Sequence, residues 1–245
     1  NLVRDVIKGC IREGFKRSDM AVLYRTHAQS RALENSLLRG SLPYQIIGGV
    51  RFYERKEIKD LLAYLKLVNN PKDDVSFRRV VNVPRRGVGA VTLAAIERAA
   101  GEGSLLDALM DDRTLDTLPR AQREKASEFA RLINRFRLKA KKETVYDVLS
   151  GIMEAVSYRE YLQEDRKTAE TRIENIEELL VETQRFTSSA EKPFLAEFLE
   201  EIALISDIDG LKTEETVALM SLHNSKGLEY RVVIITGLDE GLLPH

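Results

Sequence analysis

The sequence predicts an α/β fold in which a parallel sheet is interrupted by a large all-α insertion. Strand patterns occur only toward the two ends of the 245-residue chain, at residues 21–24, 44–47, 216–220 and 232–235. Between residues 57 and 205 the apolar side chains recur at helical spacing instead. An order of strands, then helices, then strands is typical of a helical block inserted into an α/β domain.

The first part of the chain predicts one helix followed by a β-α-β unit. Residues 2–14 carry apolar side chains at helical spacing and end at a glycine, as helices often do. Residues 19–47 then read as a strand, a helix over residues 28–39, and a second strand that begins after Pro43. We expect this unit to be parallel and its crossover to be right-handed.

The central block predicts a series of helices and little else. Ser104 and Thr144 precede two of them and are suitable N-caps. The expected helices cover residues 57–68, 74–81, 91–100, 104–110, 120–141, 145–156, 168–184 and 193–205.

The last two strand patterns are continuous apolar runs, which suggests buried parallel strands. The turn between them holds His223, Asn224, Ser225, Lys226, Gly227 and Glu229. In open α/β sheets, ligands bind at the loops that follow the carboxyl ends of the strands. A cation, an imidazole, a carboxylate and a flexible glycine therefore stand where a phosphate ligand would bind. From the spacing alone, an ordinary polar connection is an equally good interpretation.

Charge is balanced over the whole chain but segregated within the helical block. The 38 basic and 39 acidic residues give a net charge of −1, which is no global signature of nucleic-acid binding. Residues 119–142 carry nine basic and two acidic side chains, whereas residues 174–201 carry eight acidic and two basic ones. Two solvated faces that pair with each other explain this pattern, and a weak electrostatic track for DNA along the basic helix is the alternative.

Several other classes of protein are disfavoured. A single cysteine, Cys10, excludes an intramolecular disulfide and suits a reducing cytoplasm. Three histidines and one cysteine argue against a zinc site. No apolar run approaches the roughly 20 residues that span a bilayer, and no signal-peptide pattern is present. We expect a cytoplasmic protein with no membrane partner, and both ends of the sequence look like cuts in a longer chain.

The turn described above lies within a longer motif that resembles motif V of the UvrD/PcrA/Rep family of superfamily-one DNA helicases. The matching residues are His223, Lys226, Gly227, Leu228, Glu229, Glu240, Gly241, Pro244 and His245. Three further stretches resemble other elements of the family. Residues 20–31 match its motif IV, residues 48–60 match the element that follows, and residues 82–89 match its glycine turn for duplex DNA. The four matches occur in the order of the family.

The resemblance implies an incomplete RecA-like sheet domain of the P-loop NTPase type with a large all-α inserted domain. Residues 1–47 and 214–245 would form parts of the motor domain called 2A in the family, and residues 48–213 the inserted domain called 2B. The parent protein would be an ATP-dependent 3′–5′ DNA helicase that uses ATP and Mg²⁺. Its partners would be single-stranded DNA, the junction of single-stranded and duplex DNA, and a missing N-terminal motor domain.

The resemblance also assigns roles to individual residues of the sheet domain. Lys226, Gly227 and Glu229 would bind the nucleotide. Arg25 and His27 would contact single-stranded DNA, and Arg51, His223 and His245 would also contact DNA. His223 and Lys226 would lie between the nucleotide and DNA sites and couple them. Position 27 more often carries asparagine in the family, although a neutral imidazole still donates one hydrogen bond.

In the helical block, Arg85, Arg86, Gly87 and Gly89 would contact duplex DNA. Glycines let the backbone approach a phosphate, and the N-terminus of the helix that follows favours anions. On pattern alone, a turn between two helices explains these residues equally well. Phe52 and Tyr53, which follow Arg51, are expected to pack inside the protein rather than to stack on bases.

Two motifs of a complete motor are absent from the sequence. There is no phosphate loop of the form Gly-x-x-x-x-Gly-Lys-Ser/Thr (Walker A) and no acidic pair at the end of a strand (Walker B). We therefore expect no nucleotide to be bound to this chain alone and no ATPase activity from it.

Two other functions remain open at this stage. The chain could be a stand-alone or autoregulatory module that binds duplex junctions. It could also dock repair or replication proteins through the acidic residues 174–201. As part of a DNA helicase it would be associated with the nucleoid.

Overall fold

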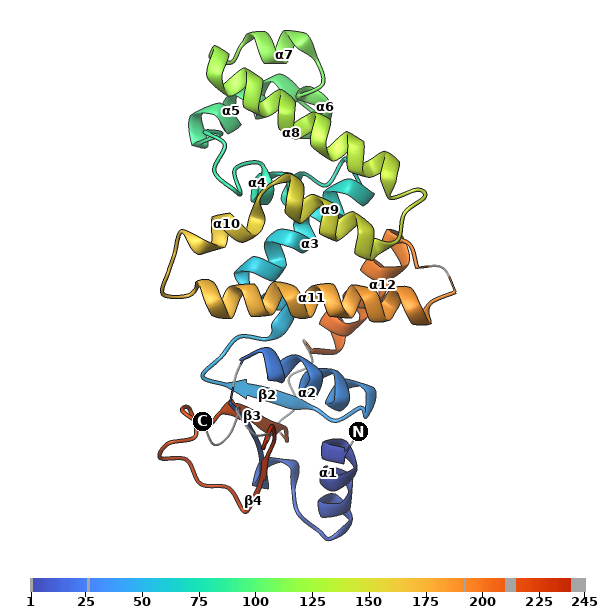
Figure 1. Ribbon diagram of the computed structural model, residues 1–245, viewed down its shortest axis with the longest axis vertical. Coiled ribbons are helices and arrows are strands. Elements are labelled where there is room, and N and C mark those ends of the chain that lie inside the picture. The colour runs from blue at the N-terminus through green and yellow to red at the C-terminus, as the bar shows by residue number, and fades with distance from the viewer. Residues whose placement is uncertain (1, 26, 192, 210–214, 239–245) are drawn as a thin grey trace. The chain divides into compact units, whose positions relative to one another are not determined.

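A computed structural model describes residues 2–25, 27–191, 193–209 and 215–238. The chain divides into two compact units. The first combines residues 1–55 with residues 203–245, and the second is the continuous stretch 56–202. Figure 1 shows strands in the first unit and helices throughout the second.

The first unit contains a four-stranded sheet in the order β2-β3-β1-β4, in which every pair of neighbours is parallel. The strands are β1 (Met20–Tyr24), β2 (Tyr44–Ile47), β3 (Val217–Ser221) and β4 (Val232–Ile235). The central strands β1 and β3 therefore come from opposite ends of the sequence. Their registers pair Ala21 with Ala218 and Tyr24 with Ser221.

Two helices cover one face of the sheet, α1 (Leu2–Arg12) and α2 (His27–Arg39) (Figure 1). Alternate strand residues on this face, such as Val22 and Leu219, pack against Ile7 of α1 and Leu37 of α2. The other face has a smaller core of Ala21, Leu23, Ala218 and Met220, packed with Ile47, Leu222 and Tyr230. Short 3-10 helices at Arg17–Asp19 (η1) and Phe52–Glu54 (η2) flank the β-α-β unit.

The second unit is entirely helical over its described residues. Its helices are α3 (Lys56–Asn69), α4 (Asp74–Val80), α5 (Ala90–Ala100), α6 (Leu105–Ala108), α7 (Asp112–Asp116), α8 (Arg120–Lys139), α9 (Val145–Ala155), α10 (Tyr158–Gln163), α11 (Ala169–Ser189) and most of α12 (Leu195–Asp209), which crosses the division between the units. Buried aromatic rings hold α3, α4 and α8 together, with Phe129 placed edge-on to Phe77 at 5.7 Å and tilted against Tyr64 at 6.3 Å.

The predicted fold class is confirmed, and both proposed N-caps are confirmed as well. The Ser104 side chain accepts a hydrogen bond from the Asp107 amide. Thr144 forms a reciprocal capping box with Asp147. Both contacts are local in sequence, which is why the sequence pattern reveals them.

Four details differ from the expectations. Helix α11 extends to Ser189 instead of ending at residue 184. Strand β4 was expected to be buried, but it lies at the edge of the sheet, where Val233 and Ile235 are 49% and 45% exposed. Helices α7 and α10 were not predicted, because five and six residues are too few to display helical periodicity. Helix α6 is shorter than expected and ends at Ala108.

Candidate nucleic-acid interface

The carboxyl ends of the two central strands bring distant parts of the sequence to one edge of the sheet. Tyr24 is the last residue of β1, and its carbonyl accepts a hydrogen bond from the Leu222 amide at 2.9 Å, directly after β3. The Thr236 amide and hydroxyl, which follow β4, donate to the Leu23 carbonyl at 2.9 and 3.0 Å. Arg25 and the turn that begins at Leu222 therefore leave the sheet side by side.

The turn after β3 presents three of the predicted site residues to solvent. His223, Lys226 and Glu229 are exposed, and no hydrogen bond or ion pair joins their side chains to the rest of the described chain. Gly227 has a φ of +85°, a conformation that glycine adopts without strain. Local hydrogen bonds fix the turn itself: the Ser225 hydroxyl donates to the Leu222 carbonyl at 2.9 Å. These hydrogen bonds define the path of the turn, and its charged groups are available to a ligand.

Asn224 connects this turn to the end of β2. Its Nδ2 donates to the Gly48 carbonyl at 3.0 Å and to the Ile47 carbonyl at 3.4 Å. Gly48 has a φ of +68°, and a Cβ there would lie 2.6 Å from Asn224 Nδ2. A side chain at position 48 would be strained by this φ and would displace the Asn224 side chain. The sequence patterns assign Asn224 no role, because the contact joins residues that are far apart in the chain.

Arg25 stands at the start of the connection from β1 to α2. Its backbone amide donates to Gln29 Oε1 at 2.9 Å, and its side chain is half-buried. No hydrogen bond or ion pair of the Arg25 side chain occurs within the described residues. The side chain of His27, at the first position of α2, and His245 both lie outside the part of the structure that is described.

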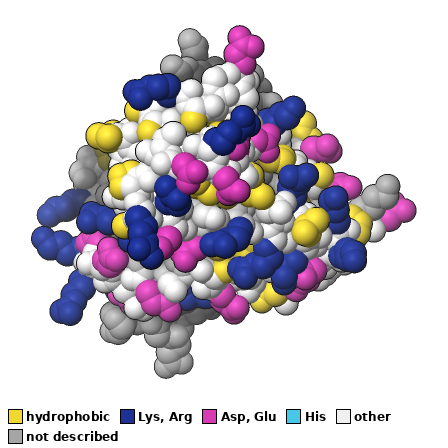
Figure 2. Space-filling view, turned by 90° about the horizontal axis from the view of Figure 1, so that it is seen from above, with side chains coloured by type: hydrophobic (Ala, Val, Ile, Leu, Met, Phe, Trp, Pro, Cys, Tyr) yellow, Lys and Arg dark blue, Asp and Glu magenta, His cyan; other side chains and the backbone are white. Residues whose placement is uncertain are grey.

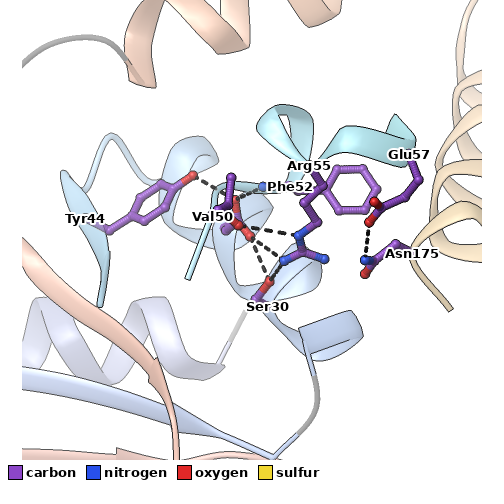
Figure 3. A network of polar contacts seen from close by, with 8 residues as sticks. Ser30, Tyr44, Val50, Phe52, Arg55, Glu57 and Asn175 are labelled. Atoms are coloured by element: carbon purple, nitrogen blue, oxygen red, sulfur yellow. Dashed lines mark hydrogen bonds and ion pairs between the residues drawn. The ribbon is translucent and has the colours of Figure 1, made fainter. Parts of the chain in front are cut away.

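A buried polar network fastens the segment after β2 onto α2 (Figure 3). The Glu34 carboxylate, 1% exposed, accepts hydrogen bonds from the Ser30 hydroxyl at 2.8 Å and the Phe52 amide at 3.2 Å. Arg55 Nη2 donates to the Ser30 hydroxyl at 2.7 Å and lies 3.9 Å from Glu34. Burial raises the pKa of Glu34, and this effect exceeds the lowering by the Phe52 amide, Ser30 and the two nearby arginines.

Two aromatic rings, those of Phe52 and Tyr53, also contact α2 next to this polar network. The Arg31 guanidinium lies over the Phe52 ring at 4.9 Å and over the Tyr53 ring at 4.3 Å. Phe52 and Tyr53 are therefore buried, as predicted, whereas the preceding Arg51 is half-buried at the N-cap of η2. Figure 3 also draws a contact within the helical unit, where Asn175 Nδ2 donates to Glu57 Oε1 at 2.6 Å.

Two adjacent arginines in the turn between α4 and α5, Arg85 and Arg86, have different environments. Arg86 Nη1 donates to the carbonyls of Val83 and Val80 at 3.0 and 3.1 Å, and Nη2 donates to the Tyr64 hydroxyl at 2.6 Å. The Tyr64 hydroxyl in turn donates to the Val83 carbonyl. Burial raises the pKa of Tyr64 to about 12, so this phenol is neutral at physiological pH. The side chain of Arg86 therefore holds the turn together, whereas Arg85 is exposed.

The glycines of this turn leave its backbone accessible. Gly87 has a φ of +74°, and no atom lies within 4 Å of a Cβ placed at Gly87 or Gly89. Gly89 is the N-cap of α5. Another molecule can approach the main chain closely here, beside the exposed Arg85.

The sequence matches the family described as the UvrD-like helicase C-terminal domain over residues 1–245. The chain belongs to this family. It is 43% identical over 240 residues to the ATP-dependent DNA helicase PcrA of Bacillus subtilis, covering 94% of this chain and 32% of that protein. It is 36% identical over 249 residues to the protein of the same name from Staphylococcus aureus, covering 100% of this chain and 34% of that protein. The chain thus spans about a third of the length of these relatives.

Among the described residues of this UvrD-like domain, no group of three or more His, Cys, Asp or Glu side chains could hold a metal ion. The described helices also include none that is both long and apolar enough to cross a membrane. The sequence patterns did not reveal the buried Glu34 network, because a buried carboxylate cannot be told from an exposed one in a sequence. They did not reveal the contact between Asn224 and Gly48 either, because these residues are far apart in the chain.

Proposed function

We propose that this chain is the portion of an ATP-dependent 3′–5′ DNA helicase that supplies half of the ATP cleft and the contacts to DNA. Residues 1–47 and 214–245 are the two parts of motor domain 2A, and residues 48–213 form the inserted domain 2B. The family membership and the two relatives named as ATP-dependent DNA helicases support this proposal. The division of the structure into a discontinuous sheet unit and a continuous helical unit supports it as well.

The observation that carries the proposal is the shared edge of the sheet at which Arg25 and the turn after β3 emerge. A nucleotide bound against Lys226, Gly227 and Glu229 would lie next to the connection that carries Arg25, which in our proposal binds the DNA backbone. Closure of the cleft on ATP would then move both sets of contacts together, and release on hydrolysis would step the protein along the strand. ATP with Mg²⁺ would bind between this sheet and an N-terminal motor domain.

The DNA contacts fall into two groups in this proposal. Arg25, His27, Arg51, His223 and His245 contact the single strand. Arg85, Gly87 and Gly89 contact the duplex, with Arg86 shaping the turn through its bonds to carbonyl groups. A nucleoid-associated protein of the cytoplasm that cooperates with repair or replication proteins fits this activity.

The decisive experiment uses the full-length helicase that contains this chain. Lys226→Ala and Glu229→Ala are expected to lower DNA-stimulated ATP hydrolysis by about tenfold or more, since each removes a charged contact worth roughly 1.5–3 kcal/mol. Lys8→Ala, an exposed lysine of α1, removes the same charge as Lys226→Ala and serves as the control. Equal rates for the Lys226 and Lys8 variants would refute the proposed nucleotide site.

The isolated chain supplies a second test. It is expected to bind a duplex with a single-stranded overhang but to hydrolyse no ATP, because it carries no phosphate loop. Binding without hydrolysis also suits a stand-alone junction-binding module. The full-length experiment separates the two functions, since such a module would not depend on Lys226.

A further inference from the structure

The helical unit has a cavity of about 360 Å³ beside the turn that carries Arg85. Pro84, Arg85 and Arg86 of this turn line it. Residues of α8 and of the connection from α9 to α10 line it as well. The remaining lining residues are Lys125, Glu128, Phe129, Leu132, Ala155, Val156 and Ser157.

The cavity is positively charged. Arg85 and Lys125 are exposed, and neither forms a hydrogen bond or ion pair with another described residue. The hydrogen-bond partners of the Arg86 side chain are neutral, being backbone carbonyls and a phenol that stays protonated below about pH 12. Glu128 is the single acidic residue of the lining. Three cations thus face one carboxylate.

The rest of the lining combines an apolar floor with one hydroxyl group. Phe129 is buried, and Pro84, Leu132 and Val156 add apolar surface. Ser157 has a φ of +50°, an unfavourable conformation for a residue with a side chain, and this exposed residue lines the cavity. A phosphodiester has matching parts: an anionic phosphate for the cations and the hydroxyl, and a deoxyribose edge for the apolar floor.

We propose that this cavity binds a backbone phosphate of duplex DNA, with Lys125 and Ser157 as contacts and Glu128 as a repulsive group that limits affinity. This inference rests on the proposed function, because it extends the duplex contact at Arg85 to α8. Lys125 and Arg135 are separated by ten residues and lie within one helix face, so basic side chains continue along α8 away from the cavity. Figure 2 shows basic and acidic side chains intermixed on the end of this unit that carries α5 to α8.

The test measures binding of the chain to a fluorescent duplex with a 3′ overhang, and to the single strand alone, at several salt concentrations. Lys125→Ala is expected to weaken duplex binding about three- to tenfold and to reduce the salt slope by about 1. Glu128→Gln is expected to strengthen binding about threefold or more by removing repulsion. Arg137→Ala is the matched control, because Arg137 is exposed on another side of α8 and lies about 18 Å further along the helix.

Ser157→Gly separates a binding role from a structural one. Glycine relieves the left-handed backbone, so the melting temperature is expected not to fall, while duplex binding weakens. Inorganic phosphate at equal phosphate concentration is expected not to displace the duplex, which distinguishes a polymer backbone from a free ion as the ligand.

The outcomes distinguish the cavity from the proposed function. If Arg85→Ala weakens duplex binding but Lys125→Ala matches Arg137→Ala, the cavity inference is wrong and the duplex turn stands. If Lys125→Ala weakens binding of the single strand as much as that of the duplex, the duplex assignment of the cavity is wrong. If the chain does not bind the junction at all, both the duplex turn and the cavity inference fail.

Discussion

Arg85 and Arg86 are adjacent in the sequence but have opposite surroundings. Arg86 donates to the carbonyls of Val80 and Val83, at the end of α4 and the start of the turn, whereas Arg85 is exposed to solvent. Arg86→Ala is expected to lower the free energy of unfolding by about 2–4 kcal/mol, because part-buried carbonyls and the Tyr64 hydroxyl lose their donor. Arg85→Ala is expected to stay within about 0.5 kcal/mol of the unmodified chain. Urea unfolding of the two variants checks this, and equal stabilities would contradict it.

Tyr64 gives a prediction for pH. The pKa of Tyr64 is raised from 10.0 to about 12, so the folded chain holds the phenolic proton more tightly than the unfolded chain. Its contribution to stability is therefore complete below pH 10 and is lost as the pH rises toward 12. The stability difference between the unmodified chain and Tyr64→Phe is expected to shift by about 1.4 kcal/mol per pH unit in that interval, to the disadvantage of the tyrosine. Chemical unfolding at pH 9 and 11 measures it, and a constant difference would contradict it.

For single residues, the sequence predicts helix caps whose partners are close in the chain. It does not predict whether a charged side chain is buried or which distant groups it contacts. The Thr144 cap is visible because its partner is three residues away. Nothing in the sequence separates Arg85 from Arg86, since the carbonyls that Arg86 binds face it only after the turn has formed. Glu34 is hidden for the same reason, because its burial depends on β2 and η2 folding over α2.

Among the elements, the connection from β2 to α3 is held more firmly than an ordinary loop. Glu34 of α2 accepts a hydrogen bond from the Phe52 amide, and Arg55 returns to Ser30 of α2. Glu34→Ala is expected to destabilise the first unit by about 3–5 kcal/mol, because Arg55 would lose the carboxylate beside it within the buried network. Glu34→Gln keeps an acceptor oxygen and is expected to cost less. Hydrogen exchange at the Phe52 amide reports the loss, and unchanged protection in both variants would refute the anchor.

The periodicity of the sequence predicts whether a segment is a helix or a strand. It does not predict whether a strand lies at the edge or in the centre of the sheet. Strands β3 and β4 are both continuous apolar runs, yet β3 is fully buried and β4 is half-exposed. The order of strands decides this difference, and it depends on pairings across the whole chain rather than on either run. The sequence likewise indicated the turn after β3 as a site, but it could not place that turn beside Arg25 without the pairing of β1 with β3.

For the whole molecule, the division into two units predicts two separable unfolding events. Leu219 is buried in the sheet core and Ile133 is buried in α8. Leu219→Ala is expected to weaken the sheet unit by about 2–5 kcal/mol and to leave the helical unit unchanged, and Ile133→Ala is expected to do the reverse. Hydrogen exchange, read separately in β1 and in α9, distinguishes the units. Equal loss of protection in both units from either variant would show a single cooperative unit.

For the whole molecule, the α/β class with a helical insertion was predictable, because the sequence changes sharply from strand patterns to helical periodicity and back again. The strand order was not, since four short strands allow several parallel arrangements.

The pairing of Ala21 with Ala218 has a consequence for biosynthesis. When β1 leaves the ribosome, its central partner is still about 200 residues from being translated. The nascent strand lacks this partner while residues 56–202, which form a compact unit of their own, can already fold. The sheet is then assembled last, and during that interval the apolar segment Met20–Tyr24 is a natural target for chaperones.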